Sequence, residues 1–328
     1  YKVELVTADN ESDNSKGITA AQNLVSSGVS IILGSYGSAV SIAAGDVFKE
    51  AGMPALGVTC TNPLVTNGNP VYFRTCFLDA TQAKAMADYA ANELSAQKVA
   101  VLYDITDDYS LGVAESFKAE AEANGLEVVA FESFQSTDTD FKSQLSKIAA
   151  ADPDALYVPS YYNTNALIAI QAKEVGLDAQ LLGADGWDGV LSALDENNKS
   201  AVEGVVFTNH FTATDPDAKV QDFVTRYREA YGSDPSSFAA LGYDAGMMLF
   251  QAIEAAGTTD SAAVNEALSN LQYEGVTGAI HYEGSGDPVK DVKFVTVKDG
   301  AYALVENGAE EAPAEEPASE EASEEAAA

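Results

Sequence analysis

The chain has 328 residues, enough for two domains with separate hydrophobic cores, and its hydrophobic fraction of 46% is ordinary for a globular protein. Its 51 acidic residues outnumber its 17 basic residues, which gives a net charge of −34. This charge repels nucleic acids and anionic membranes, so it excludes a protein that tracks phosphate groups.

Apolar runs rich in Val, Ile and Leu recur along the chain, and most lack polar alternation, as is typical of parallel strands buried on both faces. We expect strands at 2–6, 29–34, 54–58, 71–75, 98–103, 126–131, 154–158 and 202–208. Helical patterns lie between them. We expect one helix from about Ser15 and two more at 38–52 and 164–176, and Gly52 and Gly176 end these two. This alternation predicts a doubly wound α/β fold.

Two other features bound the problem. No stretch approaches 18 consecutive apolar residues, so no membrane span is expected. The chain opens on the strand-like run YKVELV, so we expect no signal peptide in it. From Ala309 the sequence AEEAPAEEPASEEASEEAAA holds eight glutamates and no basic or aromatic residue. We expect 307–328 to be a disordered acidic tail, because such a segment buries too little apolar surface.

In doubly wound folds, ligands bind beyond the carboxyl ends of the strands. The loops expected there are rich in hydroxyl, aromatic and carboxylate groups and contain no Lys or Arg. They read SYGS (35–38), TCTNP (59–63), DITDDYSLG (104–112), PSYYNT (159–164) and ADGWDG (184–189).

These loops contain little that indicates a catalytic or cofactor-binding site. The stretch GSYGS lacks the order of a nucleophile elbow, and no dinucleotide or P-loop motif is present. Neither His210 nor His281 lies in these loops, so a Ser or Cys nucleophile lacks a base. The Cys60–Cys76 spacing fits no metal motif. We expect no enzyme, no cofactor and no metal.

The residues of these loops are suited to a ligand-binding cleft. Ser38 opens a helix whose free N–H groups suit a carboxylate, and Thr59 and Thr61 add donors. Asp185 follows a later strand and suits an ammonium group. Aromatic walls come from Tyr109, Tyr161 and Trp187. Together these groups describe a site for a free amino acid. Each residue also has an ordinary structural alternative, such as a helix N-cap for Ser38 or a turn for Asp185.

The sequence from residue 1 to about 305 resembles the leucine/isoleucine/valine-binding proteins. The pieces that carry the resemblance are GSYGS, TNPLVT, YFRT, the pattern D-x-x-x-x-Y-x-x-G at 104–112, and SYY followed by GADGW. No single piece is decisive, but their order and spacing taken together are specific to this family. The resemblance implies a type I periplasmic-binding-protein fold, with two doubly wound lobes around a central cleft.

The resemblance also implies roles for single residues. Ser38 and Thr61 match residues that bind the ligand α-carboxylate, and Thr59 matches a position where a backbone carbonyl meets the ammonium. Tyr109 matches the aromatic residue that closes over the amino-acid head group, and Tyr161 matches the tyrosine beside the ammonium.

Asp185 matches the acid that pairs with the ammonium, and it is one methylene shorter than the Glu of well-known members. Tyr36 and Trp187 match walls of the side-chain pocket. The cysteines depart from the pattern of well-known relatives. Both Cys60 and Cys76 end expected neighbouring strands, so a disulfide and a pair of free thiols both stay open.

The implied domains are 1–78 with 208–283 for lobe one and 79–207 with 284–306 for lobe two. The implied function is that of an extracytoplasmic receptor, periplasmic or lipid-anchored, which closes on an amino acid and delivers it to the permease of an ABC importer. A sensor or regulatory module of the same fold is the alternative. The family's first strand and helix have no counterpart ahead of YKVELV, so the chain is expected to start after them.

Overall fold

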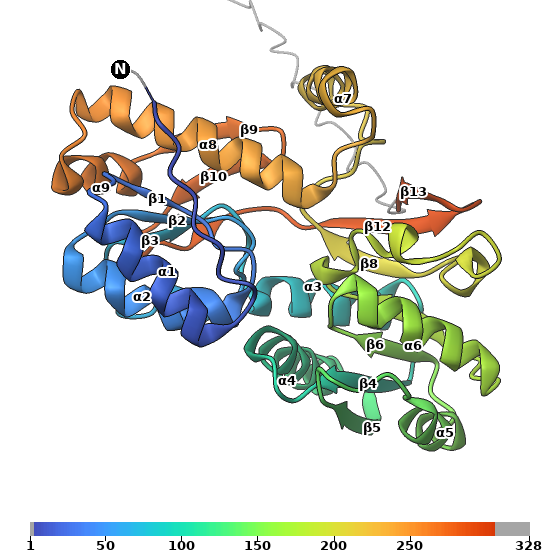
Figure 1. Cartoon of the computed structure of the whole chain (residues 1–328). Coiled ribbons are helices and arrows are strands. Elements are labelled where there is room, and N and C mark those ends of the chain that lie inside the picture. The colour runs from blue at the N-terminus through green and yellow to red at the C-terminus, as the bar shows by residue number, and fades with distance from the viewer. Residues whose placement is uncertain (1–2, 306–328) are drawn as a thin grey trace, which may run out of the picture.

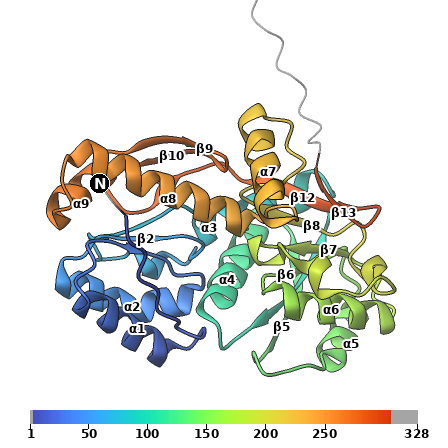
Figure 2. The ribbon, with the colours of Figure 1, turned by 45° about the horizontal axis from the view of Figure 1, so that its top comes forward.

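The computed structural model describes residues 3–305. Two groups of elements stand side by side (Figure 1), and turning the molecule keeps α1, α2, α8 and α9 apart from α5 and α6 (Figure 2). We call these groups the first and the second lobe. The acidic tail lies outside the described residues. None of the helices between residues 3 and 305 has the length and apolar character that a membrane span requires.

The first lobe is built on two small sheets. Its parallel sheet has the order β1-β2-β3 and its antiparallel sheet the order β11-β10-β9. The strands are β1 (Ile32–Leu33), β2 (Ala55–Gly57), β3 (Tyr72–Arg74), β9 (Gln272–Gly275), β10 (Gly278–Tyr282) and β11 (Pro288–Val289). Its helices are α1 (Asn14–Ser26), α2 (Ser38–Ala51), α7 (Ala218–Tyr231), α8 (Ser237–Ala256) and α9 (Ser261–Ser269).

The second lobe surrounds one sheet with the strand order β13-β12-β8-β7-β6-β4-β5. The strands are β4 (Lys98–Asp104), β5 (Glu127–Phe134), β6 (Ala155–Val158), β7 (Gln180–Gly183), β8 (Val206–Asn209), β12 (Lys293–Lys298) and β13 (Ala301–Leu304). Strands β4 to β8 are parallel, whereas β12 and β13 add an antiparallel edge. The helices are α3 (Asp79–Asn92), α4 (Asp108–Ala123), α5 (Lys142–Ala151) and α6 (Tyr162–Glu174).

Helices cover both faces of the parallel strands, as the apolar runs predict, although Leu33 of the edge strand β1 is 45% exposed. In β2, Ala55 packs towards α1 and α2, whereas its neighbour Leu56 packs towards α8 and α9. In β4, Val101 faces the core beneath α3 and α4, and Leu102 faces the core beneath α5 and α6. Alternate side chains of a strand point to opposite faces, so helices cover both sides. The doubly wound α/β prediction is confirmed.

The expected strand at 2–6 is wrong within the described residues. Residues 3–10 form no helix or strand, and the side chains of Val3 and Leu5 are 63% and 80% exposed. An apolar, β-prone run becomes a strand only where a neighbouring strand accepts its backbone hydrogen bonds, and this segment has none among residues 3–305. The expected start of the next helix is correct: Asp13 caps α1 by accepting from the Lys16 N–H at 2.9 Å.

The chain passes between the two lobes three times within residues 3–305. The first passage follows β3, the second follows β8, and the third lies between β11 and β12. The second lobe therefore interrupts the first one in sequence, and residues far apart along the chain meet where the passages lie.

Candidate functional site

Ser38 and the segment after β2 lie together at one edge of the first lobe. Ser38 is the first residue of α2, and the N-cap is Gly37. The Ser38 hydroxyl is almost fully buried and accepts the Asn62 backbone N–H at 3.2 Å. Thr59 donates to the Tyr36 carbonyl at 2.5 Å. The N-cap alternative for Ser38 is therefore wrong, because its side chain holds the neighbouring loop instead of its own helix.

Thr61 contributes a buried hydroxyl group without a proper partner. It lies beside the Asp79 carboxyl, yet neither Thr61 Oγ1 nor Asp79 Oδ2 makes a hydrogen bond of ordinary geometry with the described residues. Buried polar atoms are nearly always hydrogen-bonded in folded proteins. The two atoms thus mark a place where a partner from outside the chain would satisfy the site.

Asp185 begins a short 3₁₀ turn after β7 and is almost fully buried. Its Oδ1 accepts from the Tyr109 hydroxyl at 2.7 Å and from Gln82 Nε2 at 2.9 Å. Its backbone N–H donates to Gln82 Oε1 at 3.0 Å. Tyr109 also accepts the Gly186 N–H at 3.0 Å. The carboxylate is therefore held in one orientation by side chains from α3 and α4.

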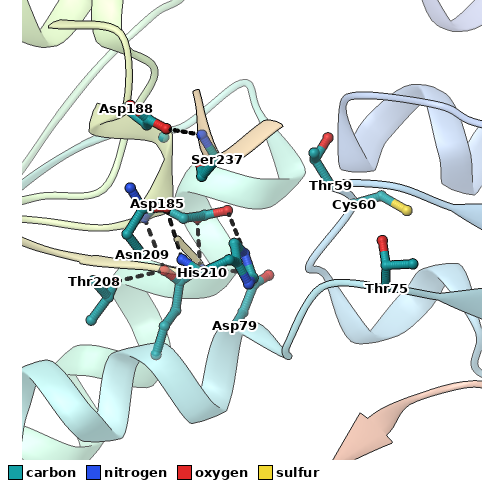
Figure 3. A network of polar contacts seen from close by, with 12 residues as sticks. Thr59, Cys60, Thr75, Asp79, Asp185, Asp188, Thr208, Asn209, His210 and Ser237 are labelled. Atoms are coloured by element: carbon teal, nitrogen blue, oxygen red, sulfur yellow. Dashed lines mark hydrogen bonds and ion pairs between the residues drawn. The ribbon is translucent and has the colours of Figure 1, made fainter. Parts of the chain in front are cut away.

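His210, which the sequence interpretation set aside, lies beside this carboxylate. It follows β8 directly, and its Nε2 is 3.5 Å from Asp185 Oδ2 (Figure 3). The imidazole stacks on Phe77 with the ring centroids 3.7 Å apart. Burial lowers the pKa of His210 to about 4, so the ring is neutral at pH 7. The contact is not an ion pair at that pH, and the charge of Asp185 lacks a cationic partner among these neighbours.

Asp79 and Gln82, on the first turn of α3, complete the polar group. Burial raises the pKa of Asp79 to about 8, so this carboxyl is largely protonated at pH 7. The Gln82 amide joins the two acids, donating to Asp79 Oδ1 at 3.4 Å as well as to Asp185. It also accepts from the Thr208 hydroxyl at 2.9 Å. The two buried acids are thus joined through one amide group.

Aromatic rings adjoin the polar cluster. The Tyr161 ring lies 5.1 Å from that of Tyr109 and 5.8 Å from that of Tyr36, measured between centroids. Tyr36 also meets Phe238 edge to face at 5.1 Å. Tyr36, Tyr109 and Tyr161 are therefore brought together as expected from the sequence, and Phe238 at the start of α8 joins them.

Trp187 lies elsewhere. Its side chain has no exposed surface and packs in the core of the second lobe with residues such as Ile168 and Val190. The indole N–H donates to the Val158 carbonyl at 2.7 Å. These contacts account for the whole side chain, so we leave Trp187 out of the aromatic wall.

Two hydrogen bonds join the lobes beside the site. Asn62 Nδ2 donates to the Asp108 carbonyl at 2.8 Å. Across from it, the Ser237 N–H at the start of α8 donates to the Asp188 carboxylate at 2.5 Å (Figure 3). An anion at a helix N-terminus is favourable, because the first N–H groups have no partner within the helix. The structure therefore holds the lobes in contact around the polar cluster.

A separate surface depression of about 570 Å³ lies between α8 and α9. Small side chains such as Ala263 line it, together with Glu266 and Asn270. None of the predicted site residues borders it, and we assign it no role. Among the described residues, no group of three or more His, Cys, Asp or Glu side chains is arranged to hold a metal ion.

Comparison with known proteins agrees with this architecture. The family model described as "Periplasmic binding protein" matches residues 1–301. A Leu/Ile/Val-binding protein homolog of Brucella melitensis is 32% identical over 291 residues, which is 87% of this chain and 77% of that protein.

Solved structures resemble the chain as well. The leucine-binding protein LivK of Thermotoga maritima superposes with a TM-score of 0.87 at 35% identity, covering 93% of this chain and 87% of that one. The branched-chain amino-acid binding protein LivJ of Streptococcus pneumoniae, solved with isoleucine, gives 0.84 at 32% identity over 92% and 87%. The chain has the type I periplasmic-binding-protein fold. It belongs to the periplasmic binding protein family, whose members are non-enzymatic substrate-binding receptors.

Proposed function

We propose that this protein is an extracytoplasmic receptor that captures a free amino acid, branched-chain or otherwise small and aliphatic, and delivers it to an ABC importer. The similarity to proteins named for leucine, isoleucine and valine supports the ligand class. The observation that carries the proposal is a buried carboxylate, Asp185, that forms an ion pair with no Lys or Arg among residues 3–305, together with the buried hydroxyl groups of Ser38 and Thr61.

The ligand's two charged groups fit the two sides of the site. Ser38, Thr61 and the first N–H groups of α2 would bind the α-carboxylate, because a helix N-terminus favours an anion. Thr59, through its backbone carbonyl, and Asp185 would bind the ammonium, with Tyr161 beside it. A buried carboxylate requires a cation or several donors, and the ammonium supplies both.

The aliphatic side chain would lie against Tyr36, Tyr109 and Phe238. Aromatic rings bury a large area without fixing a polar partner, which suits Leu, Ile or Val. The half-exposed Tyr36 ring, 42% exposed, would then mark the outer rim of this pocket.

Closure of two lobes about the passages would bury the ligand. We propose lobe boundaries at 1–78 with 208–283 and at 79–207 with 284–306, with one adjustment. Pro288–Val289 pairs with β10 of the first lobe, so we move the last boundary to the residues after Val289. The closed form would be the one that a permease binds.

A thermal-shift screen of the twenty amino acids, followed by calorimetry, tests the ligand class. We expect Leu, Ile and Val to stabilise the protein, since a ligand that binds only the folded state raises its melting temperature. Failure of all twenty would contradict the proposal. Transport assays with a membrane permease then separate the receptor from a sensor module of the same fold, which would bind without supporting uptake.

A further inference from the structure

Cys60 and Cys76 form a buried pair that the ligand site does not use. Cys60 lies between Thr59 and Thr61, and Cys76 lies in the first passage between the lobes, two residues after β3 ends. Neither side chain has any exposed surface, and both are free thiols in the structure. Isolated buried cysteines are usually inert, so what matters is their relationship to each other.

The backbone holds the two segments side by side at the cysteines. On one side of the pair, the Thr75 N–H donates to the Gly57 carbonyl at 3.0 Å. On the other side, the Asp79 N–H donates to the Thr61 carbonyl at 3.1 Å. The Thr75 hydroxyl adds a bond to the Val58 carbonyl at 2.8 Å. Cys60 and Cys76 are thus enclosed between two backbone hydrogen bonds that join their own segments.

The side chains meet as well. The Cys76 thiol donates a hydrogen bond to the Cys60 sulfur, which lowers the pKa of Cys60 to about 7, while burial raises the pKa of Cys76. The folded chain therefore brings the two sulfurs together, which is the proximity that a disulfide bond requires.

We propose that Cys60 and Cys76 are the two halves of an intramolecular disulfide bond, formed by exchange with an oxidised low-molecular-weight disulfide such as oxidised glutathione. The Cys60 thiolate attacks one sulfur of that disulfide, whose S–S bond breaks and releases one glutathione. The Cys76 thiolate then attacks the Cys60 sulfur and releases the second glutathione. Two protein thiols lose two electrons and two protons, and glutathione disulfide gains both to become two thiols.

Because both sulfurs are buried, the exchange takes place while residues 57–61 are detached from 75–79, during folding or local opening. The bond leaves the ligand site intact, since the Cys60 sulfur points away from the cluster of Asp185 and His210 (Figure 3). It would fix the loop that carries Thr59 and Thr61 to the first passage between the lobes.

The experiment unfolds the full chain with a reductant present and refolds one half in reduced glutathione and the other half in a mixture rich in oxidised glutathione. A protease digest without reductant, analysed by mass spectrometry, then reports which cysteines are linked. We expect a peptide pair joined through Cys60 and Cys76 only after oxidation, and a melting temperature higher by roughly 5 °C, because a cross-link restricts the unfolded chain.

Matched controls are Cys60→Ser and Cys76→Ser, whose melting temperatures should be the same in both buffers. The proposal would be overturned if both cysteines could still be alkylated after oxidative refolding. A mixed disulfide with glutathione that does not go on to a Cys60–Cys76 bond would also overturn it, and so would a disulfide bond between two chains. The digest of the unaltered protein decides the question even if a variant fails to fold. The result is independent of the ligand, so a failed amino-acid screen would not affect it.

Discussion

Asp185 and His210 lie 3.5 Å apart without forming an ion pair at neutral pH, because burial keeps the imidazole uncharged. The carboxylate is therefore hydrogen-bonded by Tyr109 and Gln82 but is not neutralised by a positive charge. The sequence offered no Lys or Arg in the strand-end loops as a partner for Asp185. Among the described residues the structure adds hydrogen-bond donors from Tyr109 and Gln82.

Replacing Asp185 should remove ligand binding and leave the fold in place. Truncating one member of a buried charge pair costs about 2–5 kcal/mol. We expect Asp185→Ala to lose roughly 30-fold to several thousand-fold in affinity for Leu or Val by calorimetry. Asp185→Asn keeps an oxygen that accepts from Tyr109 and Gln82, so it isolates the loss of charge.

The exposed Asp178→Ala is the matched control and should bind normally. The corresponding 2-oxo acids, which lack the ammonium, should bind the unaltered protein far more weakly than the amino acids. Tight binding of an oxo acid, or an Asp185→Ala protein with unchanged affinity, would show that the ligand class is wrong.

Thr61→Val should weaken binding without destabilising the protein. The Thr61 hydroxyl makes no ordinary hydrogen bond within the described chain, so replacing it with a methyl group costs the fold little. A ligand carboxylate that loses this donor should bind about 1–3 kcal/mol less tightly. Titration calorimetry on the variant measures the difference.

Cys60→Ser, at the adjacent position, serves as the comparison and should leave ligand affinity within a few fold. The opposite result would show that Thr61 is not the carboxylate donor. In that case the folded Cys60→Ser protein would no longer bind the ligand, whereas Thr61→Val would bind it.

Asp79 should make the protein less stable as the pH rises. Its pKa is about 8 in the folded protein and 3.8 as a free group, so the folded state keeps a proton that the unfolded state has lost. The free energy of unfolding therefore falls with rising pH across this interval. His210, with its pKa lowered from 6.5 to about 4, acts in the opposite direction below pH 6.5.

The window from pH 6.5 to 8 consequently reports Asp79 with the least interference from His210. We expect urea unfolding of Asp79→Asn to depend less on pH in this window than unfolding of the unaltered protein. An equal slope for the two proteins would mean that Asp79 is ionised in the folded state.

Substitutions of Phe238 and Trp187 should have different effects, the first on ligand preference and the second on stability. We expect Phe238→Ala to change the ranking of Leu, Ile, Val and Ala, because the ring packs on Tyr36 at the aromatic wall. Trp187→Phe strands the buried Val158 carbonyl, which should lower stability by about 1–3 kcal/mol and leave the ranking unchanged. A ranking altered by Trp187→Phe alone would reinstate Trp187 as a pocket residue.

The strand periodicity predicted the doubly wound fold, and it placed Ser38, Thr61 and Asp185 after strands, where the structure also has them. Each of these residues follows an apolar run, which is a local signal. The segment at 3–6 carries the same signal and forms no strand, because strand formation also requires a partner that local sequence does not reveal.

The residues that the sequence interpretation missed lie outside the strand-end loops it considered. Gln82 and Asp79 belong to a helix after the first passage between lobes, and Phe238 begins a helix of the other lobe. Only the tertiary arrangement brings them to Asp185 and Tyr36. His210 is different, because it directly follows a predicted strand and the same rule would have identified it.

The Gln82 amide limits the side-chain motion of Asp185. Its amide makes four hydrogen bonds, two to Asp185 and one each to Asp79 and Thr208, and turning the amide over would break all of them. Protein hydrogen bonds therefore hold the Asp185 carboxylate in one orientation. If Asp185 binds the ammonium as proposed, binding would lose little rotamer entropy at this side chain, and less free energy would be needed to order it.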